Sequence, residues 1–207
     1  MPRANFNYFA LHYLNLWLTY DCEFCKALQG HDEARKLTAL SNAATFYKVA
    51  RNLPKACDVG EGTLRYKPVL DVIDALDPST FQEPRLISSI DRVHNQISEK
   101  YRRRRVTSLT TKFLWLKMKS PIIIYDKRAR KALGTKPDLR AYYAEWRKWR
   151  KQFNSASDEI NTACASLPKV TEYSAPDAPT PQYVEEIASQ VWFKERVFDV
   201  YLWSKGN

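Results

Sequence analysis

Two residues of the sequence, Lys112 and Asp126, have the types and the spacing needed for chemistry on a sugar carbon. Lys112 is expected in the first turn of a helix over 107–119, where the helix dipole and partial burial beside Phe113 and Trp115 lower the pKa of its ammonium. A lysine with a lowered pKa can act as an amine nucleophile. Asp126 precedes the next predicted helix, whose start stabilises an ionised carboxylate. Such a pair could attack a sugar carbon or stabilise it as it becomes cationic.

Each of these residues also has an ordinary structural explanation. A lysine near a helix start is usually solvated, and an aspartate before a helix is a common N-cap. The cap and the catalytic role of Asp126 are compatible, because a capping carboxylate still has a second oxygen.

The elements that must position the pair are helices. Apolar residues recur at intervals of three or four over most of the chain, which predicts amphipathic helices. Ser and Thr are expected to cap the 107–119 helix, and Gly134 to end the helix after Asp126. Residues 122–125 are β-branched or aromatic and are expected to be extended and buried. The further predicted helices cover residues 5–28, 31–53, 68–76, 84–101, 137–153 and 184–203.

The sequence therefore predicts an all-α fold, a compact bundle of about eight helices in a single domain over residues 1–207. Residues 168–182 hold four prolines and are expected to form a surface linker before the C-terminal helix. Five glycines in 207 residues disfavour β-sandwiches, barrels and glycine-rich nucleotide folds.

The positive charge is concentrated in one part of the chain. Residues 100–151 contain 18 lysines and arginines against three acidic residues, a net charge of +15, whereas the rest of the chain carries −5. A basic block on an acidic body is typical of proteins that bind a polyanion. Nucleic acid is the favoured partner over an anionic membrane surface or a solvated face, and no apolar run is long enough for a spanning helix.

The order of residues around Lys112 and Asp126 resembles the helix-hairpin-helix DNA glycosylases, specifically their 8-oxoguanine glycosylase-like branch. Thr110-Thr111-Lys112 is similar to the lysine end of the family motif, and Pro121-Ile122-Ile123-Ile124-Tyr125-Asp126 to its aspartate end. The resemblance covers about residues 100–135. It departs from the family in the hairpin, where Val106-Thr107-Ser108-Leu109 stands in place of the family's glycines. The sequence also lacks the cysteine series of the iron–sulfur endonucleases.

The resemblance implies an enzyme that flips a modified base out of double-stranded DNA and cleaves its bond to the sugar, leaving an abasic site. Asp126 would stabilise the cationic sugar, and Lys112 would attack C1′, with or without a strand-cleaving lyase step. The implied DNA-binding residues are Arg102, Arg103, Arg104, Arg105, Thr110, Thr111, Lys127 and Arg128, and Trp115 and Tyr125 are expected at the base pocket.

Two substrates remain open at this stage. One is an oxidised purine, which would make the protein a repair enzyme. The other is a hypermodified phage base such as glucosylated hydroxymethylcytosine, which would make it an antiviral defence enzyme. The alternative is a non-catalytic helical protein that binds DNA or RNA. We expect a cytoplasmic protein without metal, organic cofactor, membrane contact or obligatory protein partner, and structural roles for Cys22 and Cys25, whose spacing alone does not make a zinc site.

Overall fold

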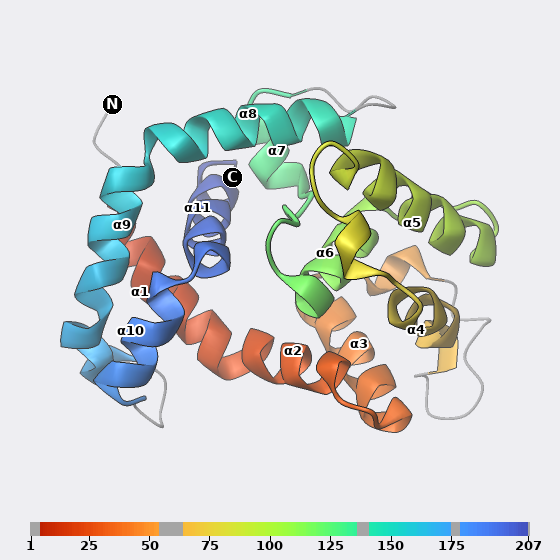
Figure 1. Ribbon diagram of the computed structural model, residues 1–207, viewed down its shortest axis with the longest axis horizontal. Helices are drawn as coiled ribbons and strands as arrows, with labels where there is room; N and C mark the ends of the chain where they lie inside the picture. Colours follow the sequence, from red (N-terminus) through yellow and green to blue (C-terminus); the bar gives the residue numbers. More distant parts are fainter. Residues whose placement is uncertain (1–4, 54–63, 136–140, 175–178, 207) are drawn as a thin grey trace. The chain divides into compact units, whose positions relative to one another are not determined.

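The computed structural model describes residues 5–53, 64–135, 141–174 and 179–206, and every regular element in these ranges is a helix (Figure 1). The all-α prediction is confirmed. The α-helices are α1 (Phe6–Leu16), α2 (Cys22–Gln29), α3 (Glu33–Phe46), α4 (Lys67–Asp74), α5 (Leu86–Lys100), α6 (Thr107–Met118), α7 (Lys127–Ala132), α8 (Ala141–Ser155), α9 (Ser157–Ser166), α10 (Pro181–Ser189) and α11 (Val191–Lys205). A π-helical turn (Trp17–Asp21) joins α1 to α2, and 3-10 helices cover Ala50–Asn52, Leu64–Tyr66, Pro78–Thr80 and Leu167–Tyr173.

The chain groups into two compact units, where the sequence predicted one domain. Unit 1 comprises Met1–Thr19 and Tyr125–Asn207, and unit 2 comprises Tyr20–Ile124. Unit 2 is thus a continuous stretch that interrupts unit 1 in the sequence. Lys112 belongs to unit 2 and Asp126 to unit 1.

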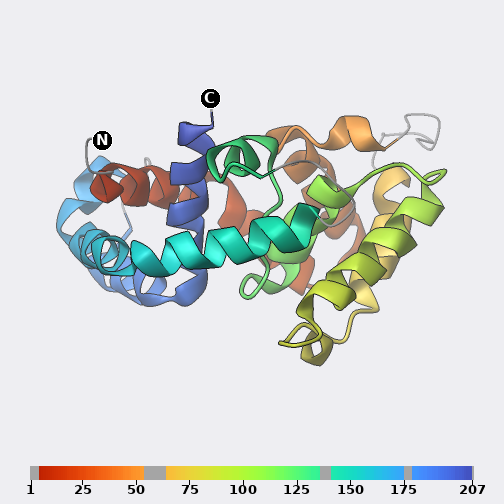
Figure 2. The ribbon, with the colours of Figure 1, turned by 90° about the horizontal axis from the view of Figure 1, so that it is seen from above.

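Unit 1 is organised around α11. This helix packs against α1, α7 and α9, and Figure 2 shows α7 beside its C-terminal half. The core includes Trp149 of α8, which stacks on Phe153 with ring centroids 4.9 Å apart and meets Phe198 of α11 edge-on at 5.2 Å. Burying such large rings supplies much of the apolar stabilisation of a domain.

In unit 2, α5 and α6 form a helical hairpin, and α6 also packs against α2 and α4 (Figure 1). Phe113 on α6 is buried and meets the Tyr66 ring at 6.5 Å. Most of α6 is buried on all sides, from Leu109 through Leu116. A helix that is buried all round carries its polar residues into the interior, and Lys112 is one of them.

The start and stop of α7 follow the sequence prediction closely. Asp126 is its N-cap, with the side chain accepting a hydrogen bond from the Arg128 backbone N–H at 2.8 Å. Gly134 follows the helix at φ +63°, and the amides of Gly134 and Thr135 bond to the carbonyls of Lys131 and Arg130. These paired bonds form a Schellman motif, which usually requires glycine at the left-handed position. Residues 122–125 are buried, as predicted, and belong to no regular element.

Three other predicted boundaries are wrong. The helix expected over 31–53 ends at Phe46, well before Pro54, which lies outside the described residues. The helix expected over 184–203 is two helices, because Gln190 is extended between α10 and α11. The linker expected over 168–182 contains a 3-10 helix, Leu167–Tyr173, and the start of α10. Pro168 and Pro181 stand in first turns, where proline costs no hydrogen bond.

Among the described residues, no helix combines the length and the apolar character that crossing a membrane requires.

Candidate functional site

Asp126 is fixed at the start of α7 by its own cap. One carboxylate oxygen is engaged by the Arg128 amide, and the side chain is partly exposed. The buried residue before it, Tyr125, accepts a hydrogen bond at its hydroxyl from the Arg130 guanidinium at 2.6 Å. The backbone on both sides of Asp126 is therefore held in place, which keeps its carboxylate in one orientation.

Two further carboxyl groups of unit 1 lie within electrostatic reach of Asp126. Glu145, on α8, is 1% exposed, and neither of its oxygens has a hydrogen-bond partner of good geometry. Burial raises the pKa of Glu145 to about 9; the positive charge of Arg130 and the Asp126 backbone N–H oppose the rise, while the charges of Asp199 and Asp126 add to it. Glu145 is therefore a neutral carboxylic acid at neutral pH.

Asp199, on α11, is the third member of this group, which we name the carboxyl cluster (Asp126, Glu145 and Asp199). Burial raises the pKa of Asp199 to about 6. The Arg196 guanidinium, 3.1 Å from one oxygen, and the Trp149 indole N–H, 2.7 Å from the other, oppose this rise. Buried, coupled carboxyl groups with raised pKa values are frequent at functional sites, although structural networks also contain them.

Lys112 lies deeper in its helix than the sequence indicated. It is the sixth residue of α6, in the second turn, so the prediction that it lies in the first turn is wrong. The field of the helix dipole is largely confined to the first turn, and it therefore contributes little at Lys112. The cap of α6 also differs from expectation, because Val106 precedes the helix and provides no side-chain cap.

The Lys112 amine is buried and contacts Ser108 and Tyr47. The residue is only 4% exposed. Its Nζ donates a hydrogen bond to the Ser108 hydroxyl at 3.0 Å and lies 5.8 Å from the centroid of the Tyr47 ring. Tyr47 in turn donates from its hydroxyl to the buried carboxylate of Asp21 at 2.6 Å. Lysine is among the residues least often buried, so this environment needs an explanation.

The turn between α5 and α6 exposes four consecutive arginines, Arg102–Arg105, which we name the arginine hairpin. Arg102 and Arg103 have φ of +58° and +56°, the left-handed conformation that glycine adopts at least cost. The turn is closed by hydrogen bonds from the Arg103 amide to the Ser98 carbonyl and from the Ser98 hydroxyl to the Arg104 carbonyl, both at 2.8 Å. Of residues 106–109, which the sequence analysis compared with hairpin glycines, Val106 directly precedes α6 and the other three begin it.

Four of the predicted contact residues are buried. Thr110, Thr111 and Trp115 on α6 are fully buried, and Tyr125 is 6% exposed. The Thr111 hydroxyl bonds back to the Thr107 carbonyl of its own helix at 3.1 Å. A contact with a DNA strand or an extruded base would require these side chains to become exposed, so their assigned roles stay predictions.

Lys127 is exposed and Arg128 partly exposed at the start of α7. The Arg128 guanidinium lies over the ring of Trp203, on the last turn of α11, 4.1 Å from its centroid. Gly206 lies so close to Arg128 that a Cβ added there would be 2.0 Å from the Arg128 carbonyl oxygen. The first turn of α7 is thus packed tightly against the end of α11.

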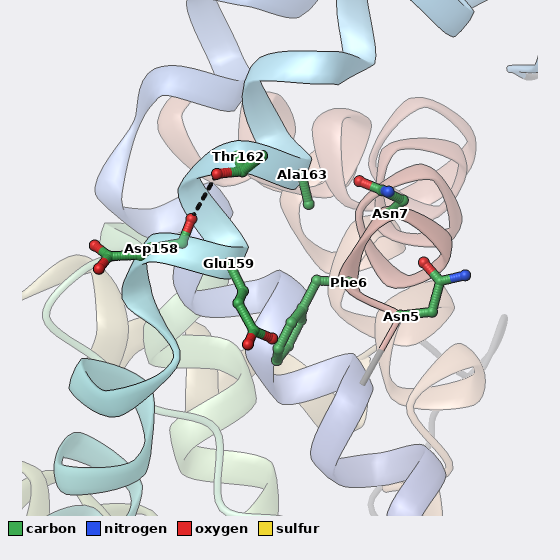
Figure 3. A pocket seen from close by; sticks show the side chains of 7 residues that line it. All are labelled: Asn5, Phe6, Asn7, Asp158, Glu159, Thr162 and Ala163. Carbon is green, nitrogen blue, oxygen red and sulfur yellow. Dashed lines mark hydrogen bonds between the residues drawn. The ribbon is translucent and has the colours of Figure 1, made fainter. Parts of the chain in front are cut away.

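A shallow pocket of unit 1 lies apart from these residues (Figure 3). It has a volume of about 330 Å³ and lies between the start of α1 and the first turns of α9. Its polar lining consists of Asn5, Asn7, Asp158, Glu159 and Thr162, and the Thr162 hydroxyl is turned back onto the Asp158 carbonyl at 2.9 Å. None of the predicted site residues lines it.

Within the described parts of the chain, no group of three or more His, Cys, Asp or Glu residues could hold a metal ion. Cys22 and Cys25 are both buried in α2.

Glu145, Asp199, Tyr47 and Asp21 are not among the residues that the sequence singled out. A weak signal existed for two of them. Glu145 stands four residues before Trp149, on the same face of α8, and Asp199 stands three residues after Arg196 in an otherwise largely apolar helix. Nothing in the sequence connects Tyr47 or Asp21 with Lys112, because these residues come from separate elements.

Comparisons of the chain with protein-family models, with curated proteins and with solved structures find no match.

Proposed function

We propose that this protein is a DNA glycosylase, which extrudes a modified base from double-stranded DNA and cleaves its bond to the sugar. The observation that carries the proposal is the burial of Lys112, whose Nζ donates a hydrogen bond to the Ser108 hydroxyl and lies 5.8 Å from the centroid of the Tyr47 ring. An amine attacks in its neutral form, and burial is one of the means by which enzymes stabilise that form of a lysine. The position of Asp126 as a fixed N-cap supplies the second group that the reaction requires.

Asp126 stabilises the positive charge that develops on the sugar as the base departs. A carboxylate held in one orientation performs this task without the cost of reorganisation, which is typically the largest contribution to such a step. The cap hydrogen bond from the Arg128 amide to one oxygen of Asp126 fixes the direction of this carboxylate.

Lys112 attacks the C1′ atom of the nucleotide that loses its base. Its nitrogen lone pair forms a bond to C1′ as the C1′–N bond to the base breaks, and the electron pair of that bond leaves with the base. The departing base takes up a proton and the attacking nitrogen loses one. Opening of the sugar ring then gives a Schiff base, from which the 3′ strand can be released. Neither step uses a metal ion or an organic cofactor.

The arginine hairpin and Lys127 bind the sugar–phosphate strand. Four exposed guanidinium groups in one turn offer charge-assisted, two-pronged contacts to phosphate oxygens. The first backbone amides of α6 have no side-chain cap. They lie at the N-terminal end of the helix, which adjoins the arginine hairpin, and backbone amides at such an end are suited to binding a phosphate.

The proposed substrate is DNA in the cytoplasm, and two classes of base fit the proposal. An oxidised purine would make the protein a repair enzyme, and a glucosylated hydroxymethylcytosine would make it a defence enzyme against phage DNA. Excision assays on genomic DNA from ordinary and base-modified phages distinguish the two.

The second candidate function is a non-catalytic nucleic-acid-binding protein. It is favoured by the arginine hairpin, whose exposed charge explains binding without any chemistry. This alternative leaves the burial of Lys112 without a function.

Borohydride trapping on a panel of modified duplexes tests the proposed function. We expect the protein to form a covalent adduct with one class of modified duplex, because borohydride reduces the Schiff base to a stable amine. The Lys112→Ala variant should form none, and the Lys169→Ala variant, which changes an exposed lysine outside the basic block, should trap like the wild type.

An adduct of equal yield in Lys112→Ala would show that another amine reacts. If no duplex gives an adduct, yet abasic sites form, the enzyme uses water as its nucleophile and Lys112 does not attack. Binding of every duplex with neither adducts nor abasic sites would favour the non-catalytic alternative.

A further inference from the structure

The Lys112 amine is surrounded by residues that the proposed function does not yet use. Ser108 stands four residues before Lys112 on α6, so the two side chains share one face of the helix. The hydroxyl of Ser108 accepts a hydrogen bond from Nζ at 3.0 Å. This bond turns the amine toward the N-terminal end of α6, the end that adjoins the arginine hairpin.

The second neighbour, Tyr47, directly follows α3 and contacts the amine through its ring. Nζ lies 5.8 Å from the ring centroid, within the range of a cation–π contact. The ring is itself held at its other end, because its hydroxyl donates to Asp21 at 2.6 Å. Asp21 is 1% exposed and is the last residue of the π-helical turn, an uncommon conformation that is often found at functional sites.

Both contacts act on the position of the amine. The hydrogen bond to Ser108 sets the direction of the Nζ atom along α6, and the ring of Tyr47 lies against that atom. The ring is held in turn by the hydrogen bond from its hydroxyl to the Asp21 carboxylate.

We propose that Ser108 and Tyr47 are positioning residues for the Lys112 amine, with Asp21 holding the Tyr47 ring in place. Ser108 sets the direction of the amine and Tyr47 covers it. This inference rests on the proposed function, because it concerns the step in which Lys112 forms a bond to a sugar carbon.

A duplex with one preformed abasic site isolates this step, since Schiff-base formation then needs no base excision. Borohydride trapping under single-turnover conditions gives the rate, and anisotropy of the labelled duplex gives the Kd. We expect Tyr47→Leu to lower the trapping rate about tenfold and Ser108→Ala several-fold, each with an unchanged Kd. The rate should be recovered in Ser108→Thr, which retains a hydroxyl, and in part in Tyr47→Phe, which retains the ring but not the bond to Asp21.

Phe81→Leu is the matched control. Phe81 is a buried ring of unit 2, directly after the 3-10 helix Pro78–Thr80, and is 2% exposed. Its loss should cost at least as much stability as Tyr47→Leu and leave the trapping rate unchanged. Melting curves establish that the compared variants are folded, and Tyr47→Phe, which alters a single hydroxyl group, carries the test if Tyr47→Leu unfolds.

The outcomes separate this inference from the proposed function. If the wild-type protein forms no adduct with the abasic duplex, the lysine chemistry of the proposed function fails. If the wild type forms the adduct while Ser108→Ala and both Tyr47 variants trap at the wild-type rate, the positioning roles are wrong and the lysine chemistry stands. Equal slowing by Phe81→Leu and Tyr47→Leu would also overturn the inference, because loss of packing would then explain both.

Discussion

The side chain of Asp126 has two tasks, capping α7 and, in the proposed mechanism, stabilising a cationic sugar. Asparagine caps helices about as well as aspartate does, so Asp126→Asn retains the hydrogen bond to the Arg128 amide and removes only the charge. We expect this variant to bind DNA like the wild type and to excise the base roughly a hundredfold more slowly or worse. Single-turnover excision and duplex binding, measured side by side, check this.

Asp126→Ser is the companion variant, because serine also caps a helix but has no carboxyl group. It should behave like Asp126→Asn in both assays. Retention of most of the excision rate by either variant would show that the carboxylate is not catalytic.

Glu145 makes the stability of the protein depend on pH. Its pKa is about 9 in the folded protein against an ordinary 4.5, so the folded state binds the extra proton between these values. Stability therefore falls as pH rises through this window, by up to about 1.4 kcal/mol per pH unit for one such group. Asp199 adds to this loss of stability only below about pH 6, because its pKa in the folded protein is about 6.

We expect Glu145→Gln, which resembles the neutral acid in shape, to flatten this dependence and to unfold at higher urea concentration than the wild type at pH 8. The urea midpoints of both proteins at pH 6, 7 and 8 measure the pH dependence of stability. Glu185→Gln, at an exposed position on α10, should leave the slope as it is. A Glu145→Gln protein with the pH slope of the wild type would mean that Glu145 is charged at neutral pH.

At the scale of elements, the arginine hairpin combines a backbone suited to glycine with side chains that carry charge. Arg102→Gly with Arg103→Gly keeps the left-handed turn, since glycine adopts positive φ without steric cost, and removes two charges. We expect this double variant to be at least as stable as the wild type and to bind any duplex more weakly. The slope of log K against log salt should fall by about two if both arginines contact phosphates.

Arg102→Lys with Arg103→Lys is the control, because it keeps the charge and the strain of the turn. Its salt slope should match that of the wild type. If the glycine variant and the wild type bind a duplex with equal affinity at the same salt concentration, the arginine hairpin is not part of the DNA-binding surface.

For the whole molecule, the sequence predicted the class of fold and the elements whose signals are local. The cap at Asp126 and the stop at Gly134 are set by a few neighbouring residues, and both are confirmed. No proline or glycine marks the break between α10 and α11 at Gln190. The π-helical turn at Trp17–Asp21 lies within a continuous helical pattern of apolar residues. Such irregularities depend on tertiary packing, which a single sequence does not display.

The candidate site also has one part that the sequence predicted and one part that it did not. The order of Lys112, Pro121, the apolar run and Asp126 is visible in the sequence, and so is the basic block around it. The environment of each residue is not, because it is made by partners far along the chain, such as Asp21 and Tyr47 in unit 2 and Asp199 in unit 1. The sequence indicated partial burial of Lys112 beside Phe113 and Trp115, but its almost complete burial depends on the helices that pack around α6.

The close approach of Gly206 to Arg128 has a mechanical consequence. With room for no more than a hydrogen atom between the two backbones, the last turn of α11 and the first turn of α7 cannot slide past each other. Any tilt of α7 that draws Asp126 toward a bound nucleotide would carry Trp203 along as part of the same rigid body.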